Sequence, residues 1–140
     1  FGIAYNNRGF TYDYLDEHQR SIQDYDKAIQ LDPEYADAYK NRGLAYIALG
    51  EHQRATQDYE KAIQLDPDDA DTSCGRGIAY VNLGEHQRAI QDYDKAIQLD
   101  PNDPWGYNFR GRAYQKLGQA SKAKQDFAKF RSLAPKMSAS

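Results

Sequence analysis

Apolar and small residues recur in this chain at spacings of three and four, in stretches that end at Gly or at Asp-Pro. Within 36–49, Tyr39, Gly43 and Tyr46 fall on one face of a helix. Within 52–65 the stripe consists of Ala55, Tyr59, Ala62 and Ile63. The pattern predicts two helices, each with one apolar side, separated by a short turn.

The residues that end these stretches give a reason for the helix ends. Gly50 follows the first stretch, and Gly readily adopts the left-handed conformation that terminates a helix. The second stretch ends at Asp66-Pro67, because Pro disfavours helical geometry in the residue before it. Asp is among the few other residue types that tolerate the left-handed conformation. The same stop is expected at the positions equivalent to Gly50, which are Asp16, Gly84 and Gly118.

The chain repeats itself every 34 residues. The segment 17–33 reads EHQRSIQDYDKAIQLDP, and near-identical copies occupy 51–67 and 85–101. A degraded fourth copy ends at Pro135. The repeats are therefore about 2–35, 36–69, 70–103 and 104–137. One such hairpin cannot bury its apolar sides alone, so a period of this length predicts stacked hairpins.

Each repeat carries a Gly in mid-helix, where Gly costs about 1 kcal/mol relative to Ala. These residues are Gly9, Gly43, Gly77 and Gly111. Their recurrence at one phase predicts a close approach of two helices. The aromatic residues expected to fill the space between helices are Tyr25, Tyr59, Tyr93 and Phe127.

In its order of aromatic, Gly, Tyr, Ala, aromatic, Ala and Pro residues, the chain resembles the tetratricopeptide-repeat family over about residues 2–135. The second repeat meets this pattern at Tyr39, Gly43, Tyr46, Ala55, Tyr59, Ala62 and Pro67. The departures are Ser73 for the first aromatic residue, Ser21 for an Ala, and Phe130 for the second Ala. The resemblance implies an all-α fold, a right-handed superhelix of antiparallel helix pairs in a single array over 2–135.

Composition narrows the functional classes. The net charge of −3 and the pI of about 5.6 argue against a nucleic-acid partner, because such binding relies on Lys and Arg. No run of about 18 apolar residues is present, so we expect no membrane insertion. A mean hydropathy of −0.94 together with 12 Tyr residues indicates a thin core of Tyr and Ala, which suits a solenoid.

An Arg precedes each mid-helix Gly, at a position where the family usually has an apolar residue. An Asp lies sixteen residues after each of these Arg residues. The expected structural ion pairs are Arg8–Asp24, Arg42–Asp58, Arg76–Asp92 and Arg110–Asp126. Each would join the first helix of a repeat to its second, in the fork-to-carboxylate geometry that Arg favours. An Arg row that grips an acidic ligand is the alternative, and the matching Asp row argues against it.

The resemblance implies that the first helices line a concave groove. Carried over by repeat phase, the expected peptide-binding residues are Asn6, Asn7, Phe10, Tyr14, Lys40, Asn41, Leu44, Ile47, Ile78, Val81, Trp105, Asn108, Phe109 and Arg112. These positions differ between repeats whose second helices are nearly identical. Ligand contact explains such variation, and so does drift on an unused surface. Asn7 and Asn41 are candidate clamps for a peptide backbone, with Trp105 and Phe109 as anchors.

Family members that bind chaperones hold a C-terminal carboxylate with a Lys/Asn, Asn and Lys/Arg constellation over three repeats. Asn41 fits the middle position of that constellation. The first-repeat positions hold Asn6 and Phe10, and the third-repeat positions hold Asp71 and Gly75. Shifting the register by one repeat breaks the constellation as well. A chaperone C-terminal tail is therefore not the expected partner.

No residue set indicates catalysis, a cofactor or a metal. His18, His52 and His86 recur at one phase, but equivalent residues of stacked repeats lie roughly 10 Å apart. Zinc ligands lie about 2 Å from the metal, so these are expected to be surface residues. Cys74, the single cysteine, has no His or basic partner nearby in the sequence.

The C-terminal end raises a separate question. Residues 136–140 are expected to be a disordered tail, which would leave Phe127, Phe130 and Leu133 as an apolar strip facing solvent. Either the parent protein continues with more helices, or copies associate end to end through this strip.

The leading functional interpretation is a non-catalytic scaffold whose concave groove binds a peptide or helix of a partner protein. A structural spacer or self-associating array without a peptide ligand is the first alternative. A regulatory domain of a larger enzyme is the second.

Overall fold

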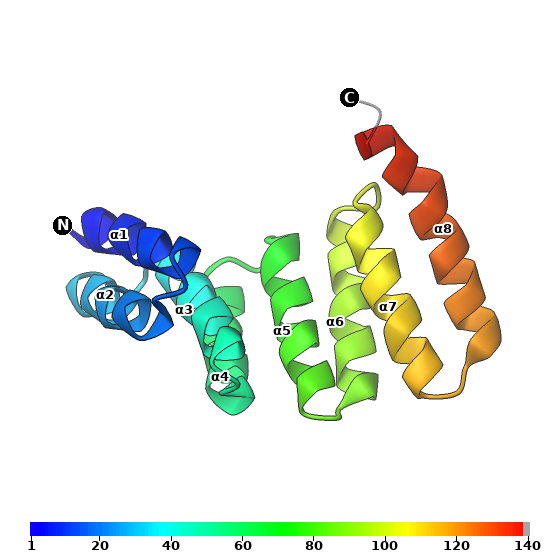
Figure 1. Ribbon diagram of the computed structural model, residues 1–140, viewed down its shortest axis with the longest axis horizontal. Helices are drawn as coiled ribbons and strands as arrows, with labels where there is room; N and C mark the ends of the chain where they lie inside the picture. The colour runs from blue at the N-terminus through cyan, green and yellow to red at the C-terminus, as the bar shows by residue number, and fades with distance from the viewer. Residues whose placement is uncertain (139–140) are drawn as a thin grey trace. The chain divides into compact units, whose positions relative to one another are not determined.

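The computed structural model describes the backbone of residues 1–138 and the side chains up to residue 134. This part of the chain holds eight helices and no strand, so the expected all-α fold is confirmed (Figure 1). The helices are α1 (Gly2–Tyr14), α2 (His18–Leu31), α3 (Ala36–Ala48), α4 (His52–Leu65), α5 (Ala70–Asn82), α6 (His86–Leu99), α7 (Pro104–Lys116) and α8 (Ala120–Ser138). None of the helices in this part is long and apolar enough to cross a membrane.

The turn inside each repeat forms as the sequence predicts. Gly50 has a φ of +78°, and Asp16 takes the same role with a φ of +61°. In the second repeat, the N–H of Glu51 donates to the Tyr46 carbonyl at 2.9 Å and the N–H of Gly50 to the Ile47 carbonyl at 3.0 Å. These bonds satisfy carbonyls that the end of α3 would otherwise leave without partners.

The helix ends predicted at Asp-Pro are also found in the structure, whereas the last repeat has no helix end at its Pro. Asp66, before Pro67, leaves the helical region with φ −144° and ψ 85°. By contrast, α8 continues through Pro135 to Ser138, so the expected tail is wrong for residues 136–138. Pro135 follows Ala134 instead of Asp, and Ala has the highest helix propensity of all residues. Residues 139–140 of the expected tail lie outside the described residues.

The mid-helix Gly residues mark close contacts with the aromatic residue of the same repeat. A Cβ at Gly77 would lie 2.5 Å from Cε1 of Tyr93, and one at Gly9 would lie 2.7 Å from Cε1 of Tyr25. Both tyrosines are buried. The predicted close approach is confirmed, because only Gly leaves room for the ring against the helix backbone.

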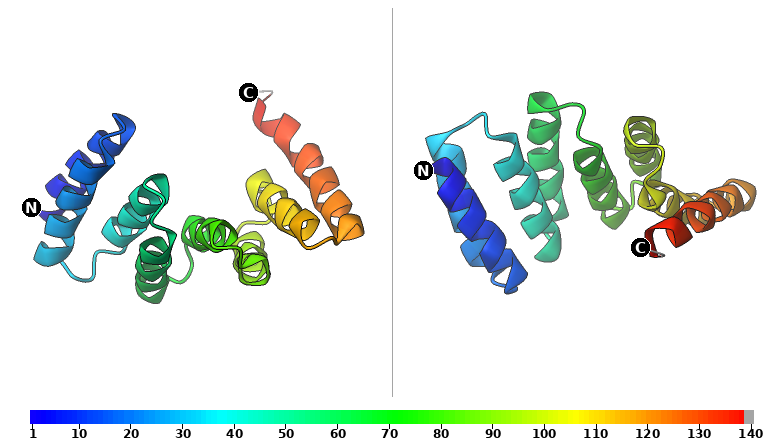
Figure 2. Two further views of the ribbon diagram at one scale, coloured as in Figure 1. Left: turned by 60° about the horizontal axis from the view of Figure 1, so that its bottom comes forward. Right: turned by 90° about the horizontal axis from the view of Figure 1, so that it is seen from above.

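The chain divides into two compact units, Phe1–Asp68 and Asp69–Ser140. In the first unit α2 packs between α1 and α3, α4 packs on α3, and α1 also touches α3 (Figure 2). In the second unit α5, α6, α7 and α8 pack in the same order, and α5 touches α7. Within each unit, the first helices of the two repeats (α1 and α3, or α5 and α7) are therefore neighbours. That all four repeats form a single array stays a prediction.

The apolar strip expected at the C-terminal end is not open to solvent. Phe127 lies against Gly111, since a Cβ there would meet its ring at 2.8 Å. The ring of Phe130 lies 5.3 Å from that of Trp105, and Phe130 and Leu133 are both half-buried. Phe127 and Phe130 of α8 lie against α7, so the prediction of a solvent-exposed strip is wrong for these two rings. End-to-end association stays a prediction without that strip to support it.

Candidate functional site

Every repeat contains the Arg–Asp pair that its sequence predicts. In the second repeat, Nε and Nη2 of Arg42 donate to the two carboxylate oxygens of Asp58 at 2.8 and 2.7 Å. The same fork geometry occurs in Arg8–Asp24, Arg76–Asp92 and Arg110–Asp126. The four Asp residues are buried against the first helix of their own repeat. This geometry supports a structural role for the Arg row.

Two of these arginines also hold the preceding repeat of their unit. Nη1 of Arg42 donates to Asp26 at 2.8 Å, and Nη1 of Arg110 donates to Asp94 at 3.0 Å. Burial raises the pKa of Asp58, although the Arg42 guanidinium opposes the rise. Because desolvation offsets much of the attraction, these pairs fix the register of the hairpins more than they add net stability.

The first unit has a groove between its two first helices, which we call the α1/α3 groove. It has a volume of about 320 Å³. Its lining consists of Phe10, Asp13, Tyr14, His18, Leu44, Ala45, Ile47 and Ala48. Phe10, Tyr14 and Leu44 are exposed large apolar side chains. Four of the expected peptide-binding residues thus meet at one place, namely Phe10, Tyr14, Leu44 and Ile47.

Asp13 is the polar centre of the α1/α3 groove. Its Oδ2 accepts a hydrogen bond from the Tyr25 hydroxyl at 2.6 Å, and its Oδ1 lies 2.9 Å from Nδ1 of His18. Burial and the Asp13 carboxylate both raise the pKa of Tyr25. One carboxylate therefore satisfies two groups on α2 and ties the end of α1 to that helix.

The second unit has an equivalent groove between α5 and α7, which we call the α5/α7 groove. Its volume is about 450 Å³. The lining consists of Ile78, Val81, Asn82, Tyr93, Phe109, Arg112, Ala113, Gln115 and Lys116. Residues 10, 13, 14, 44, 45, 47 and 48 of the first groove, advanced by two repeats, become 78, 81, 82, 112, 113, 115 and 116 here. The two grooves are the same place in the fold.

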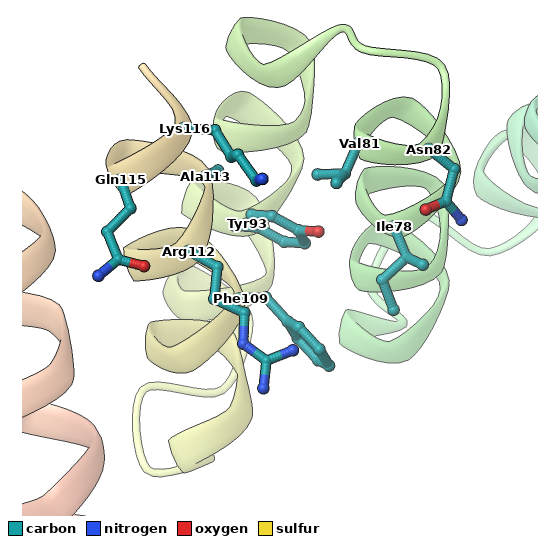
Figure 3. A pocket seen from close by; sticks show the side chains of 9 residues that line it. All are labelled: Ile78, Val81, Asn82, Tyr93, Phe109, Arg112, Ala113, Gln115 and Lys116. Carbon is teal, nitrogen blue, oxygen red and sulfur yellow. The ribbon is translucent and has the colours of Figure 1, made fainter. Parts of the chain in front are cut away.

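Figure 3 shows how the side chains of the α5/α7 groove lie. Ile78 and Val81 face across from α5, and the Tyr93 ring lies between the two first helices with its hydroxyl toward α5. The ammonium group of Lys116 reaches over the gap, while Gln115 points away from it. The rings of Tyr93 and Phe109 stack at 5.9 Å. The groove thus combines an apolar wall with positive charge at its mouth.

The two grooves carry opposite charge. The α1/α3 groove contains Asp13 and no Lys or Arg. The α5/α7 groove contains Arg112 and Lys116 and no carboxylate. Among the described residues, neither of these two cations pairs with a carboxylate, and Arg112 lies 6.0 Å from the Phe109 ring centre.

Several of the expected groove residues are buried, are hydrogen-bonded to other residues or lie outside the grooves. Asn6 is buried, donates to the Tyr35 hydroxyl at 3.2 Å and accepts from Asn41 at 3.1 Å. Asn108 is also buried. The hydrogen bonds of Asn6 support a packing role for that residue, and Asn41 has one amide donor committed. A ligand contact at Asn6, Asn41 or Asn108 stays a prediction. Trp105, Lys40 and Asn7 lie outside both pocket linings.

The expected set also left out residues that line the grooves. Tyr93 was assigned to packing and His18 to the surface, yet both contribute to a groove wall. Asp13, Asn82 and Lys116, which have the inward repeat phase in the sequence, belong to the lining as well. The repeat phase of the first-helix residues indicates from sequence alone that they face the groove. No sequence signal separates a buried repeat tyrosine from one whose hydroxyl reaches a groove.

Comparison with known sequences settles the family. Sequence models of the tetratricopeptide repeat match residues 36–69, 58–91 and 106–137, and a TPR-repeat model matches 14–50 and 79–118. The chain belongs to the tetratricopeptide-repeat family. Together the matches cover residues 14–137 of this tetratricopeptide-repeat protein without a gap. No curated protein matches it.

Solved structures show the same tetratricopeptide-repeat fold. A crystal structure of MamA superposes with a TM-score of 0.92 at 29% identity, covering 99% of this chain and 81% of that one. MamA from Desulfovibrio magneticus RS-1 has a TM-score of 0.90 at 21% identity, and the match covers 97% of this chain and 77% of that one. At this identity the match supports a common fold only. The first TPR of Spaghetti (RPAP3), bound to the HSP90 peptide SRMEEVD, has a TM-score of 0.82 at 25% identity and covers 84% and 93%.

Proposed function

We propose that this tetratricopeptide-repeat chain is a non-catalytic scaffold that binds an apolar peptide or helix of a partner protein in its α1/α3 and α5/α7 grooves. One observation carries the proposal. First-helix positions that vary between the repeats, while the second helices of the first three repeats are nearly identical, line two pockets at equivalent places. Drift on an unused surface has no reason to leave apolar side chains exposed there.

The form of the grooves fits a peptide chain. Each groove runs between two helices and offers aliphatic and aromatic walls with a few polar groups, which is the usual make-up of a groove that accepts an amphipathic helix. Phe10 and Leu44 are each more than half exposed, at 59% and 56%. Covering such side chains contributes about 25 cal/mol per Å² of apolar area.

A chaperone C-terminal tail is not the proposed ligand, although the Spaghetti (RPAP3) domain is bound to such a peptide. That ligand needs a carboxylate-binding constellation that the sequence lacks at Phe10, Asp71 and Gly75. Asn41, the single residue that fits it, already donates to Asn6.

The test is selection of a phage-displayed library of random short peptides on the whole chain. We expect enriched peptides that bind wild type and lose affinity on the double variant Leu44→Asp, Ile78→Asp, because each Asp places a charge on an apolar groove wall. Amide shift changes on peptide addition should map to α1, α3, α5 and α7.

The matched control is Gln57→Asp with Gln91→Asp, which adds the same charges at exposed positions of α4 and α6. Circular dichroism checks that all variants stay helical. Peptides that bind the groove variant and wild type equally, or no enrichment at all, would refute the scaffold proposal and favour a spacer.

A further inference from the structure

The α5/α7 groove lacks an acceptor that its counterpart contains. In the first unit, the Tyr25 hydroxyl is satisfied by the Asp13 carboxylate at 2.6 Å. The residue equivalent to Tyr25 is Tyr93, and the residue equivalent to Asp13 is Val81. Tyr93 is 1% exposed and its hydroxyl reaches the groove, yet no described residue accepts a hydrogen bond from it.

A second group in the same unit shows the same loss. Nδ1 of His18 lies 2.9 Å from Asp13, whereas Nδ1 of the equivalent His86 is buried without a hydrogen-bond partner. Two groups that share one carboxylate in the first unit therefore have none in the second. The His86 nitrogen is a buried polar atom of the kind that rarely lacks a partner, whereas the Tyr93 hydroxyl opens onto the groove, where a ligand can reach it.

Positive charge gathers where the carboxylate is missing. Arg112 and Lys116 take the places that Leu44 and Ala48 hold in the first unit. The Lys116 ammonium group reaches over the gap in which the Tyr93 hydroxyl lies (Figure 3). Burial raises the pKa of Tyr93, while Arg112 acts in the opposite direction, so this cation influences the phenol.

We propose that the α5/α7 groove binds a side-chain carboxylate of the partner, an Asp or Glu next to an apolar residue, in the place that Asp13 fills in the α1/α3 groove. The carboxylate accepts from the Tyr93 hydroxyl and pairs with Lys116 and Arg112. The neighbouring apolar side chain packs against Ile78, Val81 and Phe109.

This inference rests on the proposed scaffold function and adds the chemistry of the ligand. The α1/α3 groove already holds its own carboxylate, which His18 and Tyr25 contact, and its lining contains no Lys or Arg, so it disfavours an acidic segment. An acidic segment is therefore expected to bind the second unit and not the first.

The experiment examines the peptides selected above for their charge. Peptides displayed as N-terminal fusions carry no free terminal carboxylate, so any acidic preference comes from side chains. An enriched peptide is then made with acetylated and amidated ends, together with its Glu→Gln twin. We expect the Glu peptide to bind about tenfold more tightly, because its hydrogen bonds are charge-assisted.

Two variants test the position of the carboxylate. Lys116→Gln with Arg112→Gln should abolish the preference for Glu over Gln while both peptides still bind. Val81→Asp places a carboxylate at the position equivalent to Asp13, so that the chain itself supplies a hydrogen-bond acceptor for Tyr93. It should abolish the same preference, whereas Gln91→Asp, which adds the same charge at an exposed position of α6 outside the groove lining, should retain it.

The outcomes separate this inference from the scaffold proposal. If selected peptides bind the grooves but show no acidic preference, or keep it in Val81→Asp, the carboxylate site is wrong and the scaffold proposal stands. If no peptide is enriched, both fail. Equal affinity of the Glu and Gln twins also overturns the carboxylate site.

Discussion

The Tyr25 hydroxyl donates a 2.6 Å hydrogen bond to Asp13, the residue at the end of α1 that also holds His18. Tyr93, two repeats later, lies in the same hairpin position but meets Val81 where Tyr25 meets Asp13. One substitution in the first helix therefore changes the second helix's tyrosine from a satisfied core residue into a groove residue with a spare donor.

Tyr25→Phe should destabilise the protein more than Tyr93→Phe. The first change removes a hydrogen bond to a carboxylate and should cost about 1.5 kcal/mol of unfolding free energy. The second removes a hydroxyl without a described partner and should stay within about 0.5 kcal/mol. Urea unfolding monitored by circular dichroism measures both. Equal losses would mean that the Asp13 bond adds nothing.

Removing one member of a buried Arg–Asp pair should be costly. Arg42→Ala leaves the Asp58 carboxylate, which is 8% exposed, without its fork and should cost about 2 kcal/mol. Arg8→Ala should cost less, because Arg8 is 59% exposed and water can replace it. Thermal melts of both variants make the comparison. Asp26→Asn is the control, since it keeps the Asp58 pair and removes only an exposed partner.

Gly77→Ala should destabilise the third repeat in spite of the better helix propensity of Ala. A Cβ there would lie 2.5 Å from Cε1 of Tyr93, and the ring cannot move away because the backbone of its own helix is behind it. The expected net loss is about 2 kcal/mol, as for other overpacked sites. Gly43→Ala is the milder companion, because its Cβ would meet Tyr59 at 3.1 Å. Denaturant unfolding should rank the two in this order, and the reverse order would contradict the packing account.

Cys74 should react slowly with alkylating reagents. The residue is half-buried beside the core of Ala89, Ile90, Tyr93 and Ala113. Burial, followed by the charge of Asp103, raises the pKa of its thiol to about 12. A raised pKa leaves less thiolate at every pH below it, so the rate should keep rising toward pH 12 instead of levelling near 9.

At pH near 8 the rate with iodoacetamide should be roughly fiftyfold below that of free cysteine, once the greater nucleophilicity of a high-pKa thiolate is allowed for. The same chain in concentrated urea is the control, and there the rate should approach the free value. A fast reaction in the folded chain would indicate that Cys74 is exposed.

The 34-residue period determined most of the fold. The stops at Asp16 and Gly50 follow from local backbone preference, and the contact of Gly77 with Tyr93 follows from a residue choice that only close packing explains. The Arg–Asp pairing could be read because both residues recur in step, so a contact sixteen residues apart was visible as a pattern.

Tertiary structure alone decided how the end of the chain and the groove residues behave. Pro135 marks a repeat end by analogy, yet α8 passes through it, because a helix end depends on the residues around the proline as well as on the proline itself. Asn6 has the phase of a groove residue but turns to Tyr35 and Asn41.

The charge of each groove depends on residues from two or three helices that the sequence keeps far apart. Repeat phase places a side chain on a face, but burial and hydrogen bonding depend on what the neighbouring helix presents there. The sequence therefore determined which positions face a groove, and the packing of helices decided which of them remain free for a ligand.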